Sequence, residues 1–139
     1  MFGFQCLDSS LPHEYRRFDC MMLLTMANNS LTKTEIPDIT VAIPTYNRAK
    51  NLYQLLTTLH FMADESAHQK ACGSGFLWEV LVVDNNSTDQ TSATIANFQK
   101  KWPEDYPLRY IWEPRRGTSF ARQRAVEEAK SQLVGFLDD

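Results

Sequence analysis

The chemistry most directly suggested by the sequence is metal binding by Asp138 and Asp139, two adjacent carboxylates that follow the apolar run at residues 134–137. Neighbouring carboxylates repel one another unless they share a cation. A hard Mg²⁺ or Mn²⁺ ion, held by one or two carboxylates and completed by substrate phosphates, meets that requirement. The pair is therefore a candidate metal site, although two solvent-exposed acidic side chains would give the same pattern.

A second candidate site follows the apolar run at residues 39–43, where the sequence reads Pro44-Thr45-Tyr46-Asn47. The flat ring of Tyr46 is suited to stacking on a planar nucleotide base. The alternative is structural: Tyr46 would pack over a sheet edge while Thr45 and Asn47 cap the helix that follows. This turn lacks the glycines of the Gly-x-Gly-x-x-Gly dinucleotide fingerprint and of the phosphate-binding P-loop, which excludes both.

Asp84 and Asn85 follow a third apolar run, residues 78–83. An ionised side chain in this position must be hydrated or hydrogen-bonded. The neighbouring amides of Asn85 and Asn86 could make paired contacts to a base or a ribose. The alternative is that the segment only forms a turn that caps the next helix.

Positive charge is concentrated between residues 115 and 124, where Arg115, Arg116, Arg122 and Arg124 lie close to Gly117. A glycine-containing helix start offers free amides to anions, so phosphate is the ligand that this segment favours. We expect Arg122, one turn into the helix, to reach the ligand. We interpret Arg115 and Arg124 as parts of a solvated basic helix face.

The elements that must position these residues alternate between short β-rich runs and helical patterns, which predicts an α/β fold built of βαβ units. Two of the strands are almost wholly apolar, as in a parallel sheet that helices cover on both faces. Ligands of such sheets bind beyond the carboxyl ends of the strands, where all the candidate residues lie. The predicted strands span residues 39–43, 78–83, 108–112 and 133–137.

Three helices are predicted between the strands. A leucine stripe predicts a helix over residues 49–62, with Asn47 as its N-cap. The spacing of Ser87 and Gln90 predicts a capping box and a helix that begins near residue 88 and buries Ile95 and Phe98. Alanines at every fourth position predict a third helix over residues 119–130, close to the sheet. Residues 63–75 are predicted to form a surface loop.

Composition places these elements in one domain, residues 36–139, after an N-terminal extension of residues 1–35 that has no sustained periodicity and is expected to be poorly ordered. With 139 residues and 43% hydrophobic residues the chain can bury a core without disulfides. A net charge of −3 gives no general basic field for nucleic acid. No apolar run approaches a transmembrane length. The odd number of cysteines, three, favours a reducing, intracellular compartment.

A flavodoxin-like receiver domain, which also binds Mg²⁺ through an acidic cluster, is disfavoured by the same strand ends. Such a domain needs an acidic pair after the first strand and a phosphorylatable aspartate after the third. Thr45-Tyr46 and Glu113-Pro114 occupy those places here.

Taken together, four segments in register, at residues 41–48, 79–89, 117–122 and 135–139, resemble the N-terminal half of family-2 glycosyltransferases. The finer pattern is similar to bacterial exopolysaccharide enzymes, including cyanobacterial ones. The resemblance implies a GT-A fold, a Rossmann-like sheet that binds a nucleotide-diphosphate sugar and a divalent cation, Mg²⁺ or Mn²⁺. It also implies transfer of the sugar to an acceptor hydroxyl, usually with inversion at the anomeric carbon.

Carried over motif by motif, the resemblance assigns most of the candidate residues to the donor. Asp138 and Asp139 match the first two positions of the Asp-x-Asp metal motif, and Arg122 matches the arginine of an Ala-Arg-Asn segment whose asparagine is Gln123 here. Family members often have a second aspartate in place of Asn85. The implied donor-binding residues are Pro44, Thr45, Tyr46, Asn47, Asp84, Asn85, Arg122 and Asp138.

The resemblance also implies a division of labour, because the family's catalytic base and acceptor site lie in its C-terminal half. We therefore expect no catalytic base up to Asp139, a donor-binding half without activity of its own, and a glycan or lipid-linked acceptor bound by the missing half. The expected location is the cytoplasm, where nucleotide sugars are made, or the inner face of the membrane. The alternative is a non-catalytic nucleotide-sugar-binding or degenerate domain.

Overall fold

The computed structural model of the chain describes residues 36–71 and 75–139, and the predicted extension at residues 1–35 lies outside them. All four predicted strands and all three predicted helices are present, which confirms the α/β fold. Their bounds are β1 (Ile39–Thr45), α2 (Ala49–Ala71), β2 (Trp78–Asp84), α3 (Thr91–Gln99), β3 (Leu108–Trp112), α4 (Thr118–Glu128) and β4 (Val134–Phe136).

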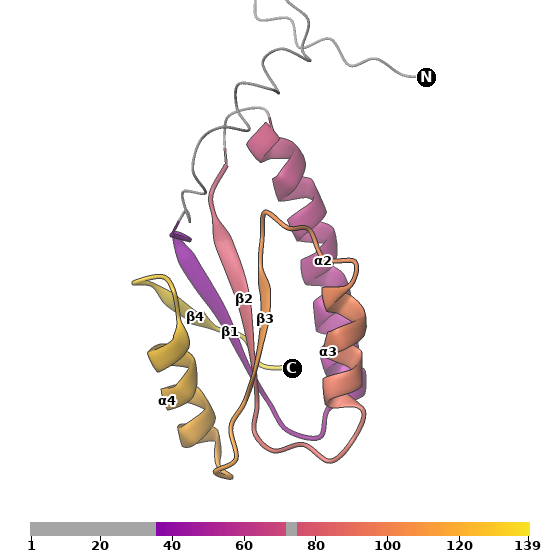
Figure 1. Ribbon diagram of the computed structural model, residues 1–139, viewed down its shortest axis with the longest axis vertical. Coiled ribbons are helices and arrows are strands. Elements are labelled where there is room, and N and C mark those ends of the chain that lie inside the picture. Colours follow the sequence, from indigo (N-terminus) through magenta and orange to yellow (C-terminus); the bar gives the residue numbers. More distant parts are fainter. Residues whose placement is uncertain (1–35, 72–74) are drawn as a thin grey trace, which may run out of the picture. The chain divides into compact units, whose positions relative to one another are not determined.

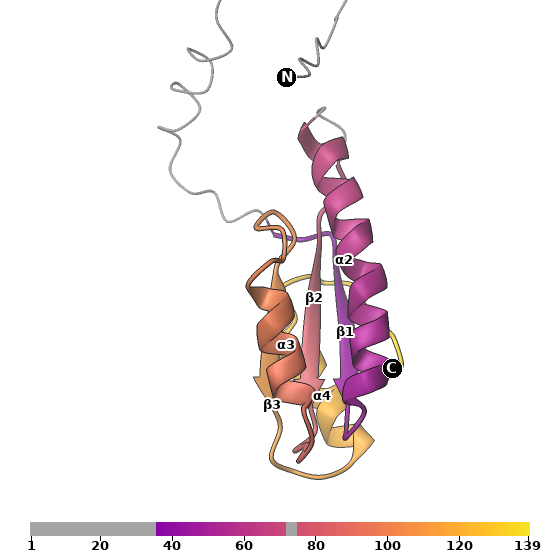
Figure 2. The same cartoon turned by 90° about the vertical axis from the view of Figure 1, so that its right-hand side faces the viewer.

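The strands form one parallel sheet in the order β3-β2-β1-β4. Helices α2 and α3 cover one face of the sheet and α4 covers the other (Figures 1 and 2). All seven residues of β2 are buried, as a strand without alternation predicts. The leucine stripe of α2 joins the larger core through Leu52, Leu56 and Leu59. In α4, Ala121 and Ala125 are fully buried against β1 and β2 in a second core.

The predicted loop at residues 63–75 is wrong for its first part, because α2 continues to Ala71. The apolar stripe that begins with the leucines continues beyond Leu59 with small residues. Ala63 is fully buried and Ala67 packs against the same core. Alanines at this four-residue spacing keep one face of the helix on the core without the bulk that marks an amphipathic pattern in the sequence.

The predicted helix caps are also wrong. Helix α3 begins at Thr91, three residues later than predicted, and Gln90 makes no side-chain capping hydrogen bond. Asp89 provides the caps instead: its Oδ1 accepts from the Thr91 amide at 3.0 Å and its Oδ2 accepts from the Ala49 amide at 3.0 Å. One carboxylate thereby serves the first residues of α2 and α3.

Asn47 does not cap α2 either. Its side-chain oxygen accepts a hydrogen bond from the Thr88 backbone amide at 2.7 Å, and its backbone amide donates to the Ser87 hydroxyl at 2.9 Å. These bonds join the β1–α2 loop to the β2–α3 loop.

Partial burial raises the pKa of Asp89, but the hydrogen bonds from Thr91 and Ala49 outweigh this effect, and the net pKa lies below its ordinary value.

A fully buried carboxylate, Glu79, lies near the amino ends of the strands, and the sequence analysis did not single it out. Its Oε1 accepts from the Thr40 hydroxyl at 2.7 Å and from the Lys130 amide at 2.9 Å. The Arg109 guanidinium lies 3.3 Å from Oε2 and also donates to the Glu128 carbonyl at 2.7 Å. The cluster joins the start of the sheet to the end of α4, and the carboxylate is bonded to other residues of the chain and closed to solvent.

Among the described residues, no helix combines the length and apolar character that crossing a membrane would require.

Candidate functional site

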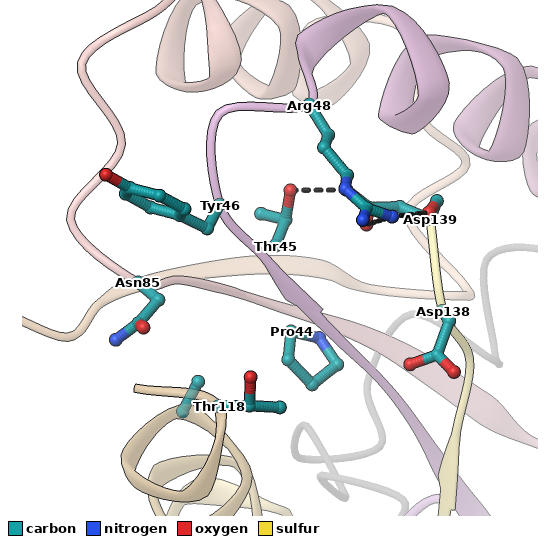
Figure 3. A pocket seen from close by; sticks show the side chains of 9 residues that line it. Pro44, Thr45, Tyr46, Arg48, Asn85, Thr118, Asp138 and Asp139 are labelled. Atoms are coloured by element: carbon teal, nitrogen blue, oxygen red, sulfur yellow. Dashed lines mark hydrogen bonds and ion pairs between the residues drawn. The ribbon is translucent and has the colours of Figure 1, made fainter. Parts of the chain in front are cut away.

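A pocket of about 400 Å³ lies beyond the carboxyl ends of β1 and β4 (Figure 3). The connection from β1 leads to β2 on one side, whereas β4 lies on the other side, so the pocket occupies the point at which the strand order reverses. Open α/β sheets bind ligands at such points. The lining residues are Pro44, Thr45, Tyr46, Arg48, Asn85, Thr118, Ala121, Asp138 and Asp139, six of which the sequence analysis singled out.

The pocket opens where β1 and β4 separate. Their ladder covers only Thr40 to Ala42 of β1, and its last bond runs from the Leu137 amide to the Ala42 carbonyl at 2.9 Å. Pro44 is the next residue of β1 that faces this side, because alternate residues of a strand bond to the same neighbour. Proline has no N–H, so the ladder cannot continue there.

Tyr46 lines the pocket and remains 42% exposed. Its ring lies 5.8 Å from the guanidinium carbon of Arg116, which belongs to the β3–α4 loop. This contact is within the range of a cation–π interaction. An exposed aromatic face is thus available at one side of the pocket, with a positive charge beside it.

Asp139 is held by the β1–α2 loop, and its side chain is only 5% exposed. The Thr45 hydroxyl donates to Oδ2 of Asp139, and Arg48 donates to the Asp139 main-chain carbonyl at 2.8 Å. Sequence reasoning missed Arg48. Its position directly after Tyr46-Asn47, at the end of a strand that precedes the pocket, was the signal that would have found it.

Asp138 differs from its neighbour because its side chain is 84% exposed. Its Oδ1 lies 3.5 Å from the Arg122 guanidinium, so Arg122 reaches the edge of the site through Asp138 without lining the pocket itself. The two carboxylates point to different partners, Asp139 toward Thr45 and Arg48, and Asp138 toward α4 (Figure 3).

The described residues contain no group of three or more histidine, cysteine or acidic side chains that could hold a metal ion by themselves. Mg²⁺ and Mn²⁺, however, need only one or two carboxylates when substrate phosphates complete the coordination. The exposed carboxylate of Asp138 fits that arrangement. The carboxylate of Asp139 is less accessible to a cation, because it is only 5% exposed and its Oδ2 is bonded to Thr45.

Asp84 lies behind the pocket and is almost fully buried, with 2% exposed. One oxygen accepts from the Ser87 amide at 2.8 Å and the other from the Tyr110 hydroxyl at 3.1 Å. Burial raises the pKa of Tyr110, and the charge and hydrogen bond of Asp84 raise it further, to about 12. Tyr110, which sequence reasoning missed, therefore stays a hydrogen-bond donor to Asp84 at neutral pH.

The β3–α4 loop leads to Thr118, which lines the pocket, and Asn85 is bonded to this loop. The amide of this side chain bonds to the backbone of Arg115 and Gly117. The Arg115 side chain donates to Glu113 at 2.8 Å, and these hydrogen bonds hold the pKa of Glu113 at about 2. Arg115 also lies over the Phe120 ring, so it is not simply part of a solvated basic face as predicted. Asn47, like Asp84, does not line the pocket.

Comparison with known proteins agrees with this architecture. The model of the family described as Glycosyl transferase family 2 matches residues 40–139. A putative teichuronic acid biosynthesis glycosyltransferase, TuaG of Bacillus subtilis, is 30% identical over 102 residues, which cover 73% of this chain and 35% of that protein.

Two solved structures show the same fold. The crystal structure of residues 1–349 of S. aureus TarS superposes with a TM-score of 0.55 at 26% identity, covering 73% of this chain and 27% of that one. The mannosyltransferase PcManGT from Pyrobaculum calidifontis, in complex with GDP-Man and Mn²⁺, gives 0.50 at 25% identity, covering 85% and 34%. The chain thus spans about a third or less of the length of these proteins, and it belongs to glycosyl transferase family 2.

Proposed function

We propose that this chain is the donor-binding part of a glycosyltransferase that moves a sugar from a nucleoside diphosphate to an acceptor hydroxyl, with inversion at the anomeric carbon. The observation that carries the proposal is the pocket at the strand-order reversal, which has an exposed tyrosine ring on one side and the exposed Asp138 carboxylate on the other. A base and a phosphate-bound cation need these two kinds of surface. The neighbour solved with GDP-Man and Mn²⁺ supports both ligands.

Different residues of the chain would bind different parts of the donor. Tyr46 would stack on the base, and Asp138 would hold a divalent cation together with the two phosphates. A cation bound there supplies charge neutralisation to the departing nucleoside diphosphate. Arg122 lies beside Asp138 and is placed to exchange that ion pair for a phosphate oxygen.

Asp139, Thr45 and Arg48 would act indirectly. Their mutual bonds fix the Tyr46 loop to the end of β4, so that the base and phosphate subsites keep one spacing. The general base that deprotonates the acceptor belongs to the part of the enzyme beyond Asp139, and we therefore expect no transfer by this chain alone.

The acceptor side of the proposal is a glycan or a lipid-linked glycan, assembled in the cytoplasm where nucleotide sugars are made. The role in teichuronic acid biosynthesis for which the TuaG relative is named supports a polysaccharide as the product.

A second candidate function is nucleotide-sugar binding without transfer. The observation in its favour is that the carboxylate of Asp139 is already bonded to Thr45, which leaves Asp138 as the one exposed carboxylate that lines the pocket among the described residues. The two functions separate when the chain is extended with the residues encoded downstream. Sugar transfer by the extended protein supports the enzyme, and donor binding without transfer supports the second candidate.

The test of donor binding is a panel of nucleoside diphosphates, each with Mn²⁺, measured by thermal shift and calorimetry on the chain as it stands. At least one should raise the melting temperature. Because stacking on an aromatic side chain contributes about 1–3 kcal/mol per base, Tyr46→Ala should weaken binding by about 5-fold or more. A panel without a single stabilising nucleotide would contradict the proposal.

The matched control is Tyr53→Ala. Tyr53 is more exposed than Tyr46, 55% against 42%, but it lies on α2 against the Phe98 ring, with ring centroids 5.4 Å apart, and it does not line the pocket. Its substitution should leave nucleotide affinity unchanged.

A further inference from the structure

The amide of Asn85 connects two loops that are 30 residues apart in the sequence. Its Nδ2 donates to the Arg115 carbonyl at 2.5 Å, and its Oδ1 accepts from the Gly117 amide at 2.7 Å. The backbone amide of Asn85 donates to the Thr45 carbonyl at 2.8 Å, so the main chain at residue 85 is anchored to the end of β1. The side chain lines the pocket but is only 7% exposed, and each of its two polar atoms has a partner in the β3–α4 loop.

The two partners of Asn85 determine the orientation of its side-chain amide, with Nδ2 toward the Arg115 carbonyl and Oδ1 toward the Gly117 amide. A carbonyl oxygen only accepts and a backbone N–H only donates, so the side chain must provide one donor and one acceptor at these two places. An ionised aspartate has acceptors alone and would face the Arg115 carbonyl with an unpaired oxygen. Asparagine therefore meets a requirement that the aspartate frequent in the family cannot meet when ionised.

The bridged loop leads directly into α4, whose residues Thr118 and Ala121 line the pocket. Gly117 begins α4 with a φ of 132°, a conformation that favours glycine, and the next residue, Thr118, lines the pocket. Arg116 lies between the two bonds that Asn85 makes and is the residue that contacts the Tyr46 ring. Displacing this loop would move both the Arg116 charge and the first turn of α4.

We propose that Asn85 is a positioning residue of the donor site, which sets the place of Arg116 and Thr118 around the base pocket. The proposal rests on the proposed function, because it concerns the shape of the donor pocket. It goes further in two ways. It assigns the Asn85 side-chain amide to a bridge between two loops, and it makes nucleotide affinity depend on a neutral side chain at residue 85 that both donates and accepts a hydrogen bond.

The decisive variant is Asn85→Asp, with two readouts. The first, without any ligand, is hydrogen exchange of the Gly117 amide by NMR, which should be slow in the natural chain and at least 10-fold faster in the variant. The second is affinity for the best nucleoside diphosphate with Mn²⁺, which should fall by about 10-fold or more. Asn86→Asp adds the same charge one residue along, at a φ of 64° that aspartate tolerates, and measures the effect of charge alone.

A pH series distinguishes positioning from direct reading. A protonated aspartate has one donor and one acceptor, so at low pH Asn85→Asp should recover both the slow Gly117 exchange and the affinity relative to the natural chain at the same pH. Asn85→Ala, which can never rebuild the bridge, should not recover. Other ionisable groups around the pocket are common to all variants and cancel in that ratio: Asp84, Glu113, Arg115, Arg116, Arg48, Asp138 and Asp139.

Two results would overturn the inference. One is a Gly117 amide that exchanges equally fast in the natural chain and in Asn85→Asp. The other is a variant with slow Gly117 exchange and lost affinity, because Asn85 would then act on the ligand directly. A natural chain that binds no nucleotide, yet loses Gly117 protection on Asn85→Asp, would contradict the proposed function and still support the bridge.

If Asn85→Asp does not fold, Gly117→Ala displaces the same loop from its other end, because alanine is strained at a φ of 132°. This variant should weaken nucleotide binding to a similar degree, and undiminished affinity would overturn the inference.

Discussion

The two ends of the sheet both carry polar side chains, but they use them differently. At the amino ends, Glu79 is fully buried and its oxygens bond to Thr40, Lys130 and Arg109. At the carboxyl ends, internal bonds also join the loops, yet Tyr46 and Asp138 stay exposed around a pocket. A polar cluster is a candidate site where some of its groups remain exposed to solvent, and so to a ligand, in the folded chain.

Substitution at the closed end should produce the largest change in stability. Glu79→Ala removes the buried carboxylate that pairs with Arg109, and it leaves the Thr40 hydroxyl and the Lys130 amide without this acceptor. Breaking a buried ion pair in this way costs about 3–5 kcal/mol. Urea unfolding should show that loss, while the protein that remains folded binds nucleotide as before. Glu127→Ala, an exposed substitution on α4, should change stability by no more than about 0.5 kcal/mol, and an equal loss in both variants would refute the contrast.

A smaller loss is expected at Asp89, because this carboxylate caps two helices on the pocket side. Removing one side-chain cap costs about 1 kcal/mol, so Asp89→Ala should lower the free energy of unfolding by about 2 kcal/mol. Asp89→Asn, which keeps capping oxygens, should lose less. Two-helix capping would be refuted by an alanine variant as stable as the natural chain.

Asp89 also makes a pH-dependent contribution. Its pKa in the folded chain lies below the ordinary value of 3.8, so its ionised form is favoured by folding. That stabilisation is fully present above the ordinary value and is lost as the pH falls through the folded pKa. As the pH falls below 3.8, the stability difference between Asp89→Asn and the natural chain should therefore shrink, and a difference independent of pH would contradict this assignment.

The smallest stability effects should separate the two adjacent aspartates. Asp138→Asn should leave the melting temperature nearly unchanged and remove most of the Mn²⁺ dependence of nucleotide binding, because this carboxylate is exposed. Asp139→Asn should weaken its contacts with Thr45 and Arg48 and cost about 0.5–1.5 kcal/mol, with a smaller effect on the Mn²⁺ dependence. Calorimetric titrations with and without Mn²⁺ would measure the difference, and reversed effects would assign the metal to Asp139.

Much of the fold could be predicted because the strands are local features. An apolar, β-rich run such as residues 78–83 is recognisable without knowledge of its neighbours, and the edge of the sheet at which it ends follows from parallel topology. This is why six of the predicted residues meet in one pocket. The end of α2 was missed because Ala63 and Ala67 continue the stripe with side chains that are not distinctive.

The directions of individual side chains could not be predicted in the same way. Asp84 faces Tyr110, and Asn85 faces Arg115, partners that are 26 and 30 residues away in the sequence. No local pattern reveals such bonds. Glu79 was missed for the same reason, since a single acid within an apolar strand does not disclose that Arg109 will meet it from the next strand.

Pro44 gives the pocket an origin in the backbone. Any other residue there would place an amide hydrogen on the side of β1 that faces β4, where Thr40 already bonds to Leu133 and Ala42 to Leu137. The ladder could then lengthen by another rung and draw the two strand ends together. The separation of β1 and β4 therefore depends on the amide hydrogen that Pro44 lacks. The side chains that line the opening can vary without closing it.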